Sequence, residues 1–143
     1  FADVLLMAAE AAAETGNTAV ALDYVNQIRN RAKNMTYVKD AAGADAANYV
    51  IEPYNSFPST AYAVKAVRFE RRLELGVEGH RLFDLRRWGN SSSVISEYIS
   101  NEARTITPFG VAANAYQSKH DLSPIPLTAI DQSQGVITQN SGY

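Results

Sequence analysis

Two amphipathic stretches separated by a short break constrain the fold of this chain more than any other feature. Residues 3–15 and 19–33 carry apolar side chains at helical spacing. Between them, Gly16 and Asn17 tolerate the left-handed backbone that ends a helix. Helices of this length joined by so few residues must lie antiparallel. Residues 1–33 are therefore predicted to form a helical hairpin.

This hairpin is similar to a tetratricopeptide repeat, whose period is about 34 residues. Ala9 and Ala21 stand where such repeats need small residues, so the two helices can approach closely. The fit is partial, because Ala8 and Ala12 replace the large residues of the first helix. One hairpin cannot bury its own apolar faces. We therefore expect further repeats upstream, in a longer protein that would also carry any targeting segment.

Composition favours a helical globular domain and excludes several classes of function. The 143 residues suit one compact domain, and 22 alanines favour helix. With 13 basic and 15 acidic residues, no positive excess is available for phosphate contacts, so we expect no nucleic-acid partner. The absence of cysteine excludes disulfides, thiolate zinc sites and a cysteine nucleophile. No stretch approaches the roughly 18 apolar residues of a membrane span.

The remaining pattern predicts an all-α fold with long irregular connections. Apolar spacing predicts helices over 61–78, 81–88, a stretch through Ile99, and a short turn over 127–132. Residues 34–62 and 103–124 are predicted to be irregular. Residues 34–62 combine helix breakers with five aromatic rings, and connections this long are usually functional or disordered. The rings argue against disorder. They either stack on sugar rings or anchor the loop to the helices, and both interpretations stay open.

A charged segment, residues 68–87, has two competing interpretations. It contains six of the 13 basic residues, four carboxylates and one of the two histidines. A catalytic site would use two of its carboxylates as acid and base. A network of ion pairs would instead hold helices together, and this is the interpretation we favour. His80 and His120 lack metal-ligand spacing, so we expect no metal site, and no cofactor is expected either.

The same segment resembles the hallmark block of the SusD/RagB family. The family pattern is roughly E-R-R-x-E-L-x-x-E-G-x-R-x-x-D-L-x-R-W, and residues 70–88 meet every fixed position. The hairpin is similar to the family's last tetratricopeptide-like hairpin. The closing residues Gln139–Tyr143 resemble its usual Q-N-P-G-Y ending, with Ser141 in place of proline. The resemblance covers nearly the whole chain.

The resemblance implies a helical, surface-exposed lipoprotein of the bacterial outer membrane. Such proteins bind oligosaccharides, less often peptides, and act as lids over a SusC-type TonB-dependent transporter; they are not enzymes. Their membrane attachment is an N-terminal lipid anchor that this chain does not contain. The chain then corresponds to a C-terminal region, divided into a last hairpin, an aromatic loop, a helical hub and an irregular segment: 1–33, 34–62, 63–102 and 103–143.

For individual residues, the resemblance implies a structural hub and a separate ligand surface. The hub residues are Arg68, Glu70, Arg71, Arg72, Glu74, Glu78, His80, Arg81 and Asp84, and we expect at least two of the four arginines to be mostly buried. Ligand contacts in the family lie on variable loops. The candidates here are Tyr37, Tyr49, Tyr54 and Phe57, and then Phe109, Asn114 and Tyr116 within 105–120.

Two other functions remain as alternatives. The first is a helical glycoside hydrolase that uses two carboxylates from residues 70–84. Its catalytic carboxylates would line a cleft, whereas carboxylates of an ion-pair network would face arginines. The second is a tetratricopeptide scaffold that binds protein segments in an open concave groove.

Overall fold

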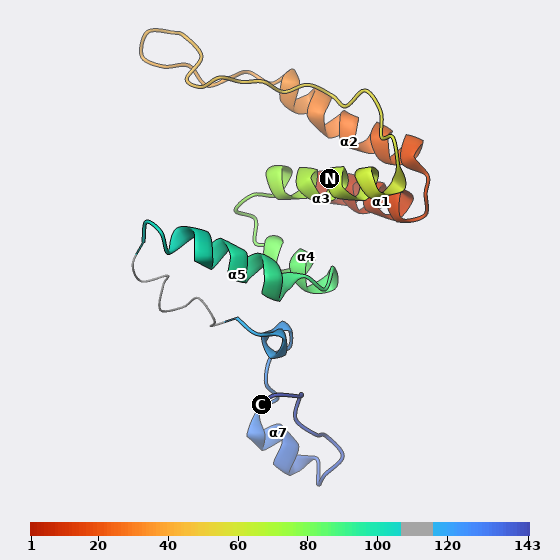
Figure 1. Ribbon diagram of the computed structural model, residues 1–143, viewed down its shortest axis with the longest axis vertical. Helices are drawn as coiled ribbons and strands as arrows, with labels where there is room; N and C mark the ends of the chain where they lie inside the picture. The colour runs from red at the N-terminus through yellow and green to blue at the C-terminus, as the bar shows by residue number, and fades with distance from the viewer. Residues whose placement is uncertain (107–115) are drawn as a thin grey trace. The chain divides into compact units, whose positions relative to one another are not determined.

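The computed structural model describes residues 1–106 and 116–143, which form two compact units, Phe1–Gly79 and His80–Tyr143. The first unit contains α1 (Ala2–Glu14), α2 (Thr18–Lys33) and α3 (Thr60–Glu74). The second contains α4 (Arg81–Arg87), α5 (Ser91–Glu102), the 3-10 helix η1 (Ser118–Asp121) and α7 (Leu127–Gln132) (Figure 1). Over the described residues, the single β feature is an isolated bridge between Lys39 and Asp45. The all-α prediction is confirmed.

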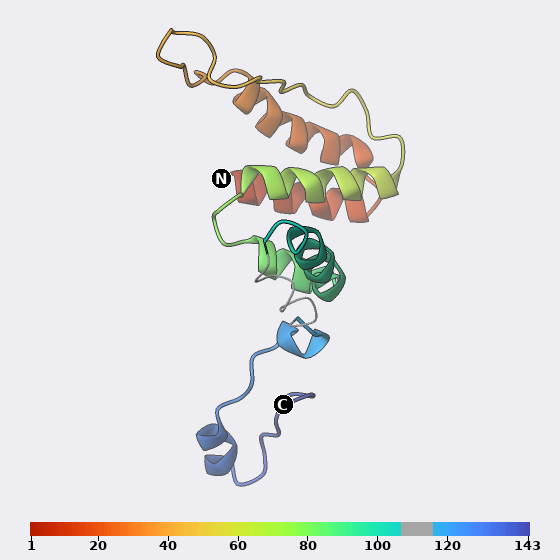
Figure 2. The ribbon, with the colours of Figure 1, turned by 60° about the vertical axis from the view of Figure 1, so that its left-hand side comes forward.

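The predicted hairpin is confirmed, and α3 completes it as a three-helix unit. The chain reverses at Gly16, whose φ of 82° is the left-handed value expected there. The Asn17 side chain then accepts the Val20 N–H at 3.3 Å and caps α2. Both α2 and α3 pack on α1 (Figures 1 and 2). Residues 34–59 connect α2 to α3.

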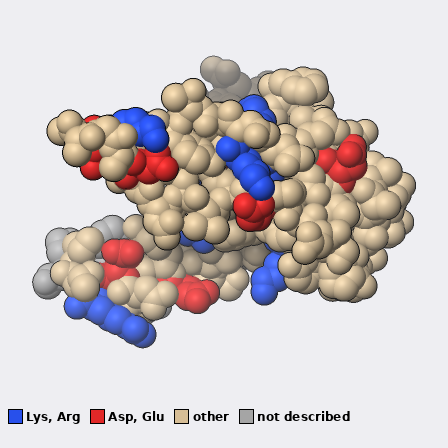
Figure 3. Space-filling model, turned by 90° about the horizontal axis from the view of Figure 1, so that it is seen from above, with Lys and Arg blue, Asp and Glu red and all other residues tan. Residues whose placement is uncertain are grey.

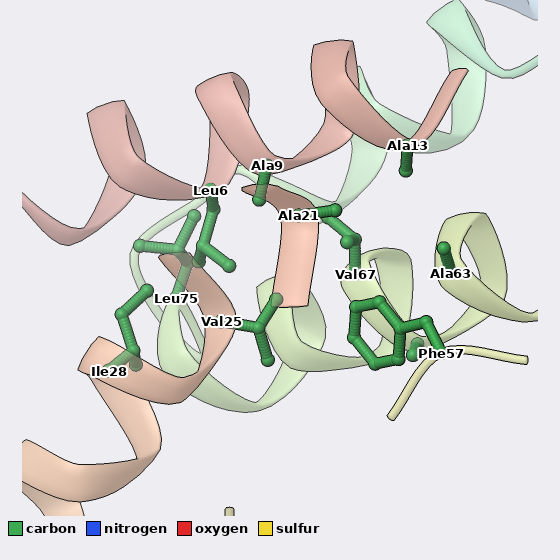
Figure 4. Packing of buried hydrophobic residues seen from close by; sticks show 11 residues of the cluster. Leu6, Ala9, Ala13, Ala21, Val25, Ile28, Phe57, Ala63, Val67 and Leu75 are labelled. Atoms are coloured by element: carbon green, nitrogen blue, oxygen red, sulfur yellow. The ribbon is translucent and has the colours of Figure 1, made fainter. Parts of the chain in front are cut away.

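Small side chains let these three helices pack closely. Four alanines from the three helices are fully buried: Ala9, Ala13, Ala21 and Ala63. Leu6, Val25 and Val67 fill the space that the alanines leave, and each is also fully buried (Figure 4). The core therefore depends on close backbone approach as much as on large apolar residues.

The third helix is shorter than predicted. We expected a helix over 61–78, but α3 ends at Glu74. The chain then turns through Val77, which has a φ of 61° and a fully exposed side chain, and Gly79, which has a φ of 82°. A left-handed residue cannot continue an α-helix, so the apolar spacing of Leu75 and Val77 extended the prediction too far. The predicted hub region 63–102 is also divided, because α3 lies in the first unit and α4 and α5 lie in the second.

In the second unit, the closing residues 139–143 bind the main chain of residues 122–125. The Gln139 side-chain amide accepts the Ile125 N–H at 2.8 Å and donates to the Ile125 carbonyl at 2.9 Å. Two further bonds run from Asn140 Nδ2 to the Ser123 carbonyl at 2.7 Å and from the Tyr143 hydroxyl to the Leu122 carbonyl at 3.1 Å. The closing motif thus has a structural role in this unit. Among the described helices, none has the length and apolar character needed to cross a membrane.

Candidate functional site

Helix α3 carries basic residues toward α1 and acidic residues toward α2. Its arginines meet carboxylates of α1, and its glutamates meet arginines of α2. Five ion pairs join them: Arg71–Asp3 at 2.9 Å, Arg68–Glu14 at 3.0 Å, Arg68–Glu10 at 4.0 Å, Arg29–Glu70 at 2.7 Å and Arg31–Glu74 at 2.5 Å. The N-terminal part of the hallmark block therefore joins all three helices through ion pairs.

Burial differs among the four hub arginines. Arg71 is 4% exposed, whereas Arg68 and Arg81 are half-buried and Arg72 is exposed. The Arg68 side chain is 31% exposed and bonds to Glu14, and Arg71 bonds to Asp3, so these two meet the expectation of at least two mostly buried arginines. Arg71 and Arg72 differ because consecutive residues lie about 100° apart around a helix, so Arg71 points into the packed side and Arg72 points into solvent.

The other hub residues lie beyond α3. Glu78 is exposed in the turn that ends the first unit. In the second unit, His80 is half-buried before α4, and the buried Asp84 accepts a bond from Arg87 at 3.0 Å.

Three of the four carboxylates in residues 70–84 face arginines. Glu70 is bonded to Arg29, Glu74 to Arg31 and Asp84 to Arg87. Catalytic carboxylates would line a cleft, whereas carboxylates that are each bonded to a guanidinium are the arrangement expected of an ion-pair network. This arrangement favours the ion-pair interpretation over the catalytic one.

The aromatic loop is fixed to α2 at its returning segment, residues 50–57. Asn26 donates to the Tyr54 carbonyl and accepts the Tyr54 N–H, each at 2.8 Å. Arg29 Nε donates to the Glu52 carbonyl at 2.6 Å. Figures 1 and 2 show this segment running back along α2 before it reaches α3. The segment therefore belongs to the packed part of the unit.

Two of the four loop candidates serve this packing. Phe57 is 7% exposed and lies in the hydrophobic core beside Val67 (Figure 4). Its ring offers no face to a ligand, so its assignment to the ligand surface is corrected. Tyr54 is half-buried. The centroid of its ring lies 5.3 Å from the Phe57 ring centroid and 4.8 Å from the Arg29 guanidinium carbon. Burial raises the pKa of the Tyr54 phenol, and the nearby Arg29 charge partly opposes this.

The other two candidates, Tyr37 and Tyr49, lie together in the part of the loop that precedes the returning segment. The rings of Tyr37 and Tyr49 stack with centroids 4.4 Å apart and planes within 13°. The Tyr37 hydroxyl donates to the Lys33 carbonyl at 2.9 Å, which ties the pair to the end of α2. We call residues 37–49 the aromatic arm. It projects past the C-terminal end of α2 (Figures 1 and 2).

The tip of the aromatic arm is held by its own hydrogen bonds. Lys39 and Asp45 form both the isolated bridge and an ion pair. The Asp40 carboxylate accepts the N–H groups of Ala42 and Ala44, each at 2.9 Å. An aspartate that binds main chain just ahead of it fixes a tight turn. The stacked tyrosines are thus carried on an ordered arm.

Tyr116 takes part in a polar network of the second unit. Its hydroxyl donates to Asp121 Oδ1 at 2.8 Å, and the fully buried Ser91 hydroxyl donates to the same oxygen at 2.5 Å. Arg86 donates to the His120 carbonyl at 2.6 Å. The hydrogen bond from Ser91 is the largest cause of a lowered pKa at Asp121, and the hydrogen bond from Tyr116 is the second largest. The candidates Phe109 and Asn114 lie outside the described residues.

Sequence reasoning missed Asn26 and Arg29 as residues that hold the loop. Their signal was available: Asn26, Arg29 and Lys33 share one face of α2 at spacings of three and four. Lys33 completes this face through its bond to the Glu52 carboxylate at 2.5 Å. A polar stripe with both donors and acceptors can bind main chain as well as water.

Charge is dispersed on the surface that the figures display. Figure 3 shows basic and acidic side chains in small separate groups. Within the two described ranges, no group of three or more histidines and carboxylates could hold a metal ion. The aromatic arm, with its stacked and partly exposed rings, is the candidate site considered below.

Comparisons with known proteins agree with these features. The model of the SusD family matches residues 1–143. A curated relative, SusD-like protein P25 of Formosa agariphila, is 30% identical over 145 residues. The alignment covers 99% of this chain and 24% of that protein, so the chain spans about a quarter of the relative's length. By its match to the family over every residue, the chain belongs to the SusD family.

Proposed function

We propose that the protein containing this chain binds oligosaccharides at the bacterial outer membrane, without catalysis, and delivers them to a SusC-type TonB-dependent transporter. Membership of the SusD family over all 143 residues carries this proposal. The family's members are outer-membrane lipoproteins that bind glycans in nutrient uptake. The pairing of Glu70, Glu74 and Asp84 with arginines supports the non-catalytic part of the proposal.

Within this chain, we propose the aromatic arm as the glycan contact. Mutual stacking covers one face of each ring, and both Tyr37 and Tyr49 remain partly exposed. A flat ring can stack on the apolar face of a sugar while its hydroxyl stays hydrated. The internal bonds of the arm lower the ordering cost of binding. These properties make the pair a preorganised platform.

Calorimetry of the full-length protein against a panel of neutral and acidic oligosaccharides and peptides tests this function. We expect Tyr37→Ala and Tyr49→Ala to weaken binding of the preferred glycan about tenfold, equivalent to about 1.4 kcal/mol. Tyr98→Ala is the matched control, because Tyr98 is 52% exposed in the other unit. Unchanged binding in both arm variants would remove the arm from the site. Turnover of any panel sugar would overturn the non-catalytic assignment.

A further inference from the structure

Three residues on one face of α2 hold the returning segment of the loop, but one of them also reaches α3. Within the part of the chain that the structure describes, the side chains of Asn26 and Lys33 bond to this segment and to no other residue. Arg29 bonds to the segment through Nε and to Glu70 through Nη1, at 2.6 and 2.7 Å. Its planar guanidinium fixes the directions of both bonds at once.

The partner of Arg29 on α3 is almost fully buried. The Glu70 side chain is 7% exposed and that of Arg29 is 16% exposed. A buried carboxylate–guanidinium bond has little freedom to rearrange, since losing it leaves a charge without compensation. Glu70 therefore limits where the Arg29 fork can point. The fork in turn bonds to the Glu52 carbonyl and lies over the Tyr54 ring.

We propose that Glu70 is a positioning residue for the glycan-binding loop. It holds the Arg29 guanidinium against residues 52–54, and this fixes the base from which the aromatic arm projects. A glutamate of the hallmark block thus serves the ligand surface without forming part of it. The effect on the loop stands on the contacts alone, whereas the effect on glycan affinity rests on the proposed function.

The neighbouring ion pair provides a matched control. Glu74 lies one turn later on α3 and bonds to Arg31 of α2 at 2.5 Å, so it joins the same two helices. The Arg31 side chain is 62% exposed. Within the residues that the structure describes, it bonds to Glu74 and not to the loop. Glu70→Gln and Glu74→Gln therefore each remove one negative charge that faces an arginine of α2. They differ because Arg29, the partner of Glu70, also bonds to the loop, whereas Arg31, the partner of Glu74, does not.

Hydrogen exchange of the full-length protein tests the proposal directly. The probe is the Tyr54 amide, which donates to Asn26, and the α1 amides serve as an internal reference for overall stability. We expect Glu70→Gln to speed Tyr54 exchange at least tenfold relative to the α1 amides, and Glu74→Gln to leave that ratio unchanged. Equal ratios in the two variants, whether both raised or both unchanged, would overturn the proposal.

A second variant decides the matter if Glu70→Gln does not fold. Arg29→Lys keeps a cation opposite Glu70 but loses the planar fork that holds two partners. We expect Arg29→Lys to speed exchange of the Tyr54 amide relative to the α1 amides as Glu70→Gln does. An unchanged ratio of these two exchange rates would overturn the proposal. Calorimetry then links the loop to binding: Glu70→Gln should weaken glycan affinity and Glu74→Gln should not. If the wild-type protein binds no glycan, the proposed function fails, while the exchange data still decide the role of Glu70.

Discussion

The side chain of Asn26 holds the main chain of Tyr54 through both halves of its amide. Oδ1 accepts the Tyr54 N–H and Nδ2 donates to the Tyr54 carbonyl, each at 2.8 Å. The amide thereby bonds to Tyr54 as a neighbouring strand would, although the two residues are 28 positions apart. The returning segment of the loop thus gains strand-like pairing without a second strand.

Replacing Asn26 tests the strength of this contact. Asn26→Ala leaves two partly buried main-chain groups of Tyr54 without their partner, which costs about 1–3 kcal/mol of the free energy of unfolding. Urea unfolding followed by circular dichroism measures the change. Gln27→Ala is the control, because its exposed bond to Asp23 should contribute less than about 0.5 kcal/mol. Equal losses for the two variants would contradict the assignment.

Phe57 should behave as a core residue. Because it lies 7% exposed in the hydrophobic cluster, Phe57→Ala should cost about 3–5 kcal/mol of the free energy of unfolding. Val50→Ala, at a side chain that is 72% exposed in the same loop, should change it by less than about 0.5 kcal/mol. Chemical denaturation measures both. A stable Phe57→Ala protein with weakened glycan binding would restore Phe57 to the ligand surface.

The hairpin could be predicted because its signals are local. A glycine and an asparagine between two periodic stretches specify the reversal, and small residues specify close packing. The end of α3 was missed although it also has a local signal. Leu75 and Val77 continue the apolar spacing, and this spacing outweighed Gly76, which directly follows the C-cap Leu75 at a position where glycine commonly ends a helix. The left-handed backbone of the β-branched Val77 has no signal of its own.

In the loop, too, local sequence patterns predicted only part of the structure. Pattern alone placed aromatic rings in residues 34–62, but it could not separate the buried Phe57 from the stacked Tyr37 and Tyr49. That difference depends on contacts between residues far apart in the sequence, such as Asn26 with Tyr54. Similarly, charge spacing indicated ion pairs in the hallmark block, but the partners Asp3 and Arg29 lie on other helices.

The neighbours Arg71 and Arg72 offer a test of the hub. Arg71 is 4% exposed and bonded to Asp3, whereas Arg72 is exposed. Truncating Arg71 removes the partner of Asp3, whose side chain is 34% exposed and stays hydrated, so Arg71→Ala should cost about 1–3 kcal/mol. Arg72→Ala should change the free energy of unfolding by less than about 0.5 kcal/mol. Thermal melts of the two variants check this, and a larger loss for Arg72→Ala would refute the orientation of α3.

The last prediction concerns the acid sensitivity of the second unit. Hydrogen bonds from Ser91 and then from Tyr116 hold the pKa of Asp121 below its usual value of 3.8. A carboxyl with a lowered pKa in the folded state stabilises that state above its unfolded pKa, and the stabilisation is lost as the pH falls through the folded value. The loss should therefore occur below about pH 4, while the contribution stays constant above about pH 5.

The Asp121→Asn variant isolates this contribution from the other carboxyls. Its amide keeps an acceptor oxygen for the Ser91 and Tyr116 hydroxyls but does not titrate in this range. Urea midpoints measured from pH 7 to pH 2.5 should show the wild-type protein as the more stable one above pH 5. The difference between the two urea midpoints should decrease steadily below pH 4, because protonation of Asp121 removes the charge that the two hydroxyls stabilise. A difference that stays constant to pH 2.5 would show that these bonds do not favour the ionised form.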